Sequence, residues 1–78
     1  MPRYYFDVQD NGSSSIDETG HEFASVNEAR LEAAKALGEI ARDILPGLSV
    51  RFISIEVRDD RGPVLSASLR FEVVDQAL

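Results

Sequence analysis

The sequence predicts an α+β domain in which one helix covers one face of a mainly antiparallel, four-stranded sheet, in the order strand, strand, helix, strand, strand. Two observations predict this fold. Both ends of the chain alternate apolar and polar residues with the period of a half-buried strand, whereas the middle repeats apolar residues every three or four positions, as a one-sided helix does. We assign residues 1–78 to a single domain, with 75–78 as a frayed tail.

The first two strands are expected to form a hairpin. Residues 3–8 alternate, and Asn11-Gly12 readily adopts the positive φ angles of a tight hairpin turn. A short return strand is expected over residues 14–18, with Ile16 as its inward apolar residue. The inward side chains of the first strand are Tyr4, Phe6 and Val8.

The helix begins at a capping box formed by Ser25 and Glu28, and Pro46-Gly47 is expected to end it. Gly38 lies inside the helix at a cost of about 1 kcal/mol relative to alanine, which predicts a close approach of the helix to the sheet there. The apolar stripe comprises Ala29, Ala33, Leu37, Ile40 and Ile44, widened by Ala36 and Ala41.

The last two strands are expected over residues 51–59 and 64–74, joined by a turn at residues 59–63. Together with the first hairpin they suggest the spatial strand order 2-1-3-4. The inward positions are Ile53, Ile55 and Val57 in the third strand, and Leu65, Ala67, Leu69, Phe71 and Val73 in the fourth.

Composition excludes several classes of protein. The net charge of −6, from 14 acidic against 8 basic residues, argues against nucleic-acid binding, which depends on Lys and Arg contacts to phosphate. The absence of cysteine rules out disulfides and thiolate metal sites. No apolar run approaches the ~20 residues of a membrane span, and no signal peptide is visible. We therefore expect a cytoplasmic protein without a cofactor, a membrane partner or a small-molecule ligand.

Five segments, residues 1–7 (Met-Pro-Arg-Tyr-Tyr-Phe-Asp), 17–20, 28–30, 41–43 and 55–59, together resemble a family of small bacterial proteins that carry a domain of unknown function. The resemblance implies a compact α+β domain of bacterial, cytoplasmic origin. It implies no catalytic residues, because no activity is established for that family. A looser similarity, at the level of the fold alone, is to the acidic antitoxin domains of bacterial toxin–antitoxin pairs.

His21 is the single histidine, and its acidic neighbours include Glu18 and Glu22. An imidazole among carboxylates could bind a divalent metal or act as a general base, but this spacing matches no known metal motif and is more typical of a solvated turn. The serines at 13–15 lack the base and orienting acid of a catalytic triad, so they indicate a loop. We therefore predict no catalytic, cofactor or metal site.

The sheet face without the helix is the stronger candidate for function. Its residues could form a protein interface, a platform for single-stranded RNA, or a solvated face with cross-strand ion pairs. The possible interface residues are Tyr5, Phe52, Arg3, Arg58 and Arg70. The remaining outward positions are Asp7, Ser54, Glu56, Ser66, Ser68 and Glu72.

The sequence thus predicts a non-enzymatic protein-interaction or regulatory module. It is expected to act through the open sheet face, or through the edge of the last strand, on a protein partner or a second copy of itself. Two alternatives stay open. One is a small metal-binding protein or enzyme centred on His21, and the other is a binder of single-stranded nucleic acid.

Overall fold

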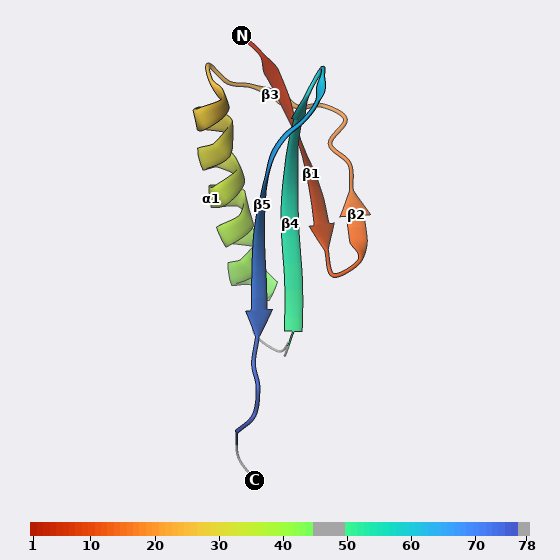
Figure 1. Cartoon of the computed structure of the whole chain (residues 1–78), viewed down its shortest axis with the longest axis vertical. Coiled ribbons are helices and arrows are strands. Elements are labelled where there is room, and N and C mark those ends of the chain that lie inside the picture. The colour runs from red at the N-terminus through yellow and green to blue at the C-terminus, as the bar shows by residue number, and fades with distance from the viewer. Residues whose placement is uncertain (45–49, 77–78) are drawn as a thin grey trace.

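The computed structural model describes residues 1–44 and 50–76 of the chain. In these residues one helix lies against one face of an antiparallel sheet, which confirms the predicted fold class (Figure 1). The elements in chain order are β1 (Arg3–Asp10), β2 (Ser13–Ser15), β3 (His21–Glu22), α1 (Val26–Ile44), β4 (Val50–Asp59) and β5 (Gly62–Glu72).

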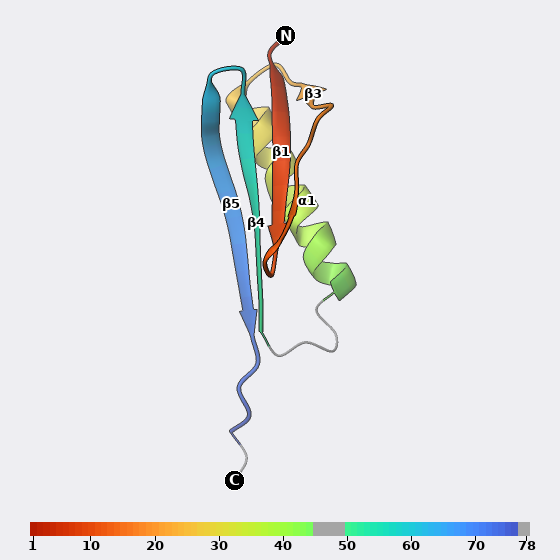
Figure 2. The same ribbon diagram turned by 90° about the vertical axis from the view of Figure 1, so that its right-hand side faces the viewer.

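The sheet has the order β2-β1-β4-β5, which is the predicted order of its strands. β1 pairs with β4 over residues 5–10, and β4 pairs with β5 along its full length. The two-residue strand β3 was not predicted, and it pairs with the start of β1, where Tyr4 lies opposite His21. β5 is therefore an outer strand of the sheet (Figure 2).

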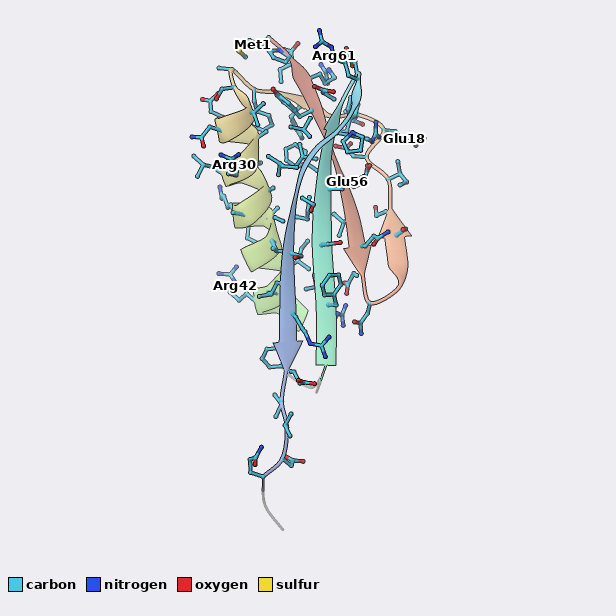
Figure 3. The ribbon with its side chains drawn as sticks, in the orientation of Figure 1. Met1, Glu18, Arg30, Arg42, Glu56 and Arg61 are labelled. Atoms are coloured by element: carbon cyan, nitrogen blue, oxygen red, sulfur yellow. The ribbon has the colours of Figure 1, made fainter. Side chains whose placement is uncertain are left out.

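The core lies between α1 and the helix-facing side of β4. Ala29, Ala33, Leu37 and Ala41 recur at every fourth position of α1 and are buried against the sheet. The small side chains of the three alanines let the helix lie close to β4, whose Ile53, Ile55 and Val57 are the largest fully buried side chains. Figure 2 shows α1 on one side of the sheet only, and Figure 3 shows Arg30 and Arg42 pointing away from it.

An aromatic cluster closes one end of the core. The ring of Phe23 packs edge-on against Phe6, with 5.8 Å between ring centroids, and lies 6.3 Å from the ring of Tyr4. Phe23 follows β3 directly and is held there because its N–H donates to the carbonyl of Pro2. The sequence contained no periodic signal that assigned Phe23 to the core.

The predicted hairpin turn and helix start are confirmed. Asn11 and Gly12 have φ angles of 51° and 95°, the left-handed values that this turn requires. At the helix start, the Glu28 N–H donates to Ser25 Oγ over 3.2 Å, and Glu28 Oε2 accepts the Ala24 N–H over 2.8 Å. The predicted helix end at Pro46-Gly47 and the side chain of Ile44 lie outside the described residues.

Three expectations about inward side chains and helix packing are wrong in the structure. Ile16 is 63% exposed and lies beyond β2, because the return strand ends at Ser15. Val73 is 51% exposed and lies beyond the end of β5, whose last residue, Glu72, is opposite Val50. Gly38 faces open space, since a β-carbon at this position would meet no atom within 4 Å, so no close approach to the sheet explains it.

α1 does not combine the length and apolarity that a membrane-crossing helix needs, and no other helix occurs in the described part of the chain.

Candidate functional site

The open face is the side of the sheet opposite α1. Strand register places Tyr5 beside Arg58 and Asp7 beside Glu56 on this face. Glu56 lies on β4, nearer the end of the strand that leads into β5 (Figure 3). On the β5 side, Phe52 is the cross-strand neighbour of Arg70. The predicted interface residues therefore occupy two separate regions. Tyr5 and Phe52 are about 20 Å apart, because six strand residues of ~3.3 Å each separate Phe52 from Arg58.

At one end of the open face, Arg58 is held by neighbouring groups. Its Nε donates to Asp7 Oδ2 over 2.7 Å, and its Nη2 donates to the carbonyl oxygen of Asp17 over 2.8 Å. The guanidinium lies over the Tyr5 ring, 4.6 Å from the centroid, in a cation–π contact. Burial raises the pKa of Asp7, but Arg58 and the Asp17 N–H outweigh it, so the pKa lies below its ordinary value.

Asp17 joins the loop between β2 and β3 to β1. Its Oδ2 accepts the Phe6 N–H over 3.1 Å, and its Oδ1 accepts the N–H groups of Thr19 and Gly20, each over 3.0 Å. Burial raises the pKa of Asp17, but these donors and the nearby His21 lower it more, so the pKa lies below its ordinary value. The Asp17 carboxylate is therefore the acceptor for one backbone N–H of β1 and two of the loop, in place of backbone carbonyls.

Arg3 also serves this loop. Its Nη1 donates to the carbonyl oxygens of Thr19 and Gly20 over 2.8 and 3.2 Å, and its Nη2 lies 4.0 Å from a carboxylate oxygen of Glu22. Gly20 has a φ of 71°, and a β-carbon there would lie 2.9 Å from the Tyr4 carbonyl oxygen and from the Tyr5 ring. Arg3, Tyr5 and Arg58 are thus engaged in holding the loop.

Phe52 and Arg70 remain available at the other end of the open face. Phe52 is 46% exposed and, together with exposed Ile16, lines a shallow hollow of about 350 Å³. Serines of β2, β4 and β5 contribute to its lining. The hollow is lined by Asp7, Val8, Gln9, Ser14, Ile16, Phe52, Ser54, Glu56, Ser66 and Ser68.

The outer edge of β5 is the second region. Among residues 1–44 and 50–76, no strand pairs with this edge over its 11 residues. Arg70 Nη2 lies 3.5 Å from Glu72 Oε1, and both side chains are exposed. The chain continues past β5 as a segment that projects beyond the helix and the sheet (Figures 1 and 2), with Val73 and Val74 exposed. We call residues 62–76 and their unpaired side the β5 edge.

A family model for the domain of unknown function DUF6894 matches residues 3–72. The chain belongs to this family. The match runs from the first residue of β1 to the last residue of β5, so the DUF6894 domain coincides with the folded unit. The resemblance seen in the sequence is therefore confirmed. No curated protein and no solved structure matches the chain.

In this DUF6894 domain, His21 lies in the short strand β3, where it is exposed, with its ring 6.5 Å from that of Phe23. Across the part of the chain that the structure describes, no three histidine or acidic side chains come together as metal ligands, so Glu18, His21 and Glu22 form no such group. Ser13, Ser14 and Ser15 form strand β2 rather than a loop, and all three are exposed.

An ion pair on the helix side of the DUF6894 sheet was not found from the sequence. Arg51 donates through Nε and Nη2 to the two carboxylate oxygens of Asp10, each over 2.6 Å. The Arg51 hydrogen bond outweighs burial and lowers the pKa of Asp10. The two residues are 41 positions apart, and only the register between β1 and β4 brings them together.

Proposed function

We propose that this domain is a non-enzymatic protein-interaction module, and that its partner adds a strand to the β5 edge. The observation that carries the proposal is the outer edge of the 11-residue strand β5, with which no strand of residues 1–44 and 50–76 pairs, and which leads directly into exposed Val73 and Val74. An outer strand presents a row of free N–H and C=O groups, which is a template for another strand.

The side chains of β5 favour such pairing. Proteins often guard outer strands with proline or with charges, but Pro63 lies at the start of β5 and removes a donor only there. Arg70 and Glu72 carry opposite charges on the same face. A partner strand with an acidic residue opposite Arg70 and a basic residue opposite Glu72 would therefore be attracted, whereas other strands would be disfavoured.

The adjoining part of the open face extends this surface. Phe52 lies beside Arg70 on the neighbouring strand and is 46% exposed, so a partner that covers Arg70 also reaches an apolar side chain. Aromatic and arginine side chains are enriched where protein interfaces have their strongest contacts. Of the five predicted interface residues, we therefore keep Phe52 and Arg70, and we assign Arg3, Tyr5 and Arg58 to the support of the loop.

The test compares capture of binding proteins from the native cell by the wild type and by two variants. Phe52→Ser and Arg70→Glu should each reduce the amount of a specifically bound protein. Two control variants make similar changes elsewhere: Leu31→Ser alters an exposed apolar residue of α1, and Arg61→Glu alters an exposed turn residue. Capture that is equal in all five proteins would contradict the proposal.

The bacterial origin and cytoplasmic location expected from the sequence remain predictions, as do the lack of enzymatic activity and of a cofactor.

A further inference from the structure

We propose that the strand added to β5 is β5 of a second copy of this chain, related by a twofold axis that passes beside Phe71. This inference rests on the proposed function, because it names the partner of the β5 edge. It follows from the charges and apolar residues along residues 68–74, which complement themselves in one register.

Symmetry restricts how two copies can pair. Two identical strands that pair in antiparallel fashion are related by a twofold axis perpendicular to the sheet, so the interface uses the same surface of both copies. Such an axis keeps both helices on one side of a continuous sheet of order β2-β1-β4-β5-β5-β4-β1-β2. A shift of the register by a single residue would oppose side chains of different faces, so the axis must lie beside a residue.

Charge selects the position of the axis. With the axis at Phe71, Arg70 of each copy lies opposite Glu72 of the other, which forms two cross-strand ion pairs. With the axis at Arg70, the two Arg70 side chains oppose each other, and with the axis at Glu72, the two Glu72 side chains do. With the axis at Leu69, Arg70 and Glu72 lie opposite serines, and no ion pair forms.

The same register matches the apolar residues. On the helix side, Phe71 lies beside Phe71 of the second copy, and Leu69 lies opposite its Val73. Leu69 and Phe71 are half-buried in one copy, whereas Val73 is 51% exposed there. Pairing would cover Val73 and would extend the core of one copy into that of the other. On the open side, Ser68 meets Val74 of the second copy, which is 60% exposed without a partner.

The first test is a charge-exchange series on the purified chain, followed by sedimentation equilibrium over a wide range of concentrations. The wild type should reach the mass of a dimer. Arg70→Glu and Glu72→Arg should each weaken the dimer by about tenfold or more, because two attractions become two repulsions. The double variant Arg70→Glu/Glu72→Arg should restore dimerisation to within a few-fold of the wild type.

Arg61→Glu is the matched control, because it changes the net charge by the same amount as Arg70→Glu at an exposed position in the turn before β5. It should leave the dimer unchanged. Circular dichroism of each variant separates a loss of folding from a loss of association. In the double variant, positions 70 and 72 still carry charges of opposite sign. It therefore also controls for the loss of the Arg70–Glu72 contact within one copy.

A second test locates the axis. The chain contains no cysteine, so a single introduced cysteine can form only an intermolecular disulfide. Phe71→Cys should cross-link rapidly on mild oxidation, because residues opposite each other in antiparallel strands have Cα atoms about 4.5–5.5 Å apart, within disulfide range. Ser68→Cys should not cross-link, because position 68 lies opposite position 74 of the second copy. The two introduced cysteines would be six strand residues, or about 20 Å, apart.

A wild-type chain that stays monomeric at all concentrations would overturn the inference. If Arg70→Glu still reduced capture from the cell in that case, the β5 edge would bind a different protein, and the proposed function would stand. A dimer that is insensitive to both charge reversals, or that the double variant fails to restore, would also overturn the inference. If capture were unaffected as well, the proposed function would fail with it.

Discussion

At the scale of single residues, Asp17 connects a loop to a strand through one carboxylate. It accepts the Phe6 N–H of β1 and two N–H groups of its own loop, while its carbonyl accepts Arg58. Backbone donors in partly buried positions need acceptors, and here a side chain supplies them between β2 and β3. The position of the loop against the Tyr5 ring therefore depends on a short acidic side chain.

Asp17→Asn should lower the free energy of unfolding by about 1–3 kcal/mol, because it removes the charge and one of the two acceptor oxygens from three hydrogen bonds. Urea unfolding followed by circular dichroism measures this change. Glu18→Gln, which removes a charge from the exposed neighbouring residue, should stay within about 0.5 kcal/mol of the wild type. Equal effects of the two substitutions would show that Asp17 acts only through its charge.

Alternation in the sequence predicted the residues that share the open face, because a strand turns successive side chains to opposite sides. Alternation could not predict which of these side chains bind the loop between β2 and β3 and which remain free to bind a partner. Arg3 and Arg58 donate to loop carbonyls whose positions depend on Gly20 and Asp17, and no periodicity describes the path of a loop. The division of the five predicted interface residues into two regions therefore required the structure.

At the scale of elements, α1 contains a glycine, Gly38, that lowers the stability of the helix and can be replaced. Gly38 is exposed in the helix interior, and a β-carbon there would meet no atom within 4 Å. Gly38→Ala should therefore stabilise the domain by about 0.5–1 kcal/mol, through helix propensity alone. Thermal unfolding measures the gain in stability.

Gly20→Ala should destabilise the domain instead, because the new methyl group would lie 2.9 Å from the Tyr4 carbonyl oxygen and the Tyr5 ring.

The two faces of β4 should respond differently to truncation. Ile55→Ala removes a side chain that is 1% exposed and should cost about 2–5 kcal/mol, a large part of the ~5–15 kcal/mol typical of a domain. Phe52→Ser, on the open face, should cost no more than about 1 kcal/mol. Chemical denaturation of both variants measures this. A large loss of stability in Phe52→Ser would show that the Phe52 ring belongs to the core, which would contradict its assignment to an interface.

Elements with long periodic patterns were predicted, and the short strand β2 was expected from the hairpin turn before it, but the two-residue strand β3 was not predicted. α1, β4 and β5 each present several turns or alternations, whereas β3 has two residues and no measurable period. Alternation also continues past Glu72 into Val73, although β5 ends at Glu72, opposite Val50. Strand ends depend on the length of the neighbouring strand, which lies far away in the sequence.

At the scale of the whole molecule, acid should weaken the fold. Asp7, Asp10 and Asp17 all have pKa values lowered by folding. The unfolded chain therefore binds protons more readily than the folded one, and the stability that these groups contribute is fully present above about pH 4, near the unfolded pKa. It is lost as the pH falls through their lower folded pKa values.

Denaturant midpoints measured between pH 7 and pH 2 should be nearly constant at first and should decrease below about pH 4. Asp17→Asn should make the decrease less steep, because it removes one of the three groups that titrate. Glu18→Gln provides the comparison, since Glu18 is exposed and has no part in these hydrogen bonds. A stability that rises on acidification would contradict the assignment of all three carboxylates.

β1 starts at one end of the molecule, and the chain leaves β5 toward the other end (Figure 1). A purification tag, a fluorophore or a neighbouring domain attached ahead of β1 would therefore stand well clear of Val73 and Val74. The same attachment placed behind those valines would crowd them and could mask association altogether. Tags and labels for the mass and capture measurements should therefore be attached at the N-terminus.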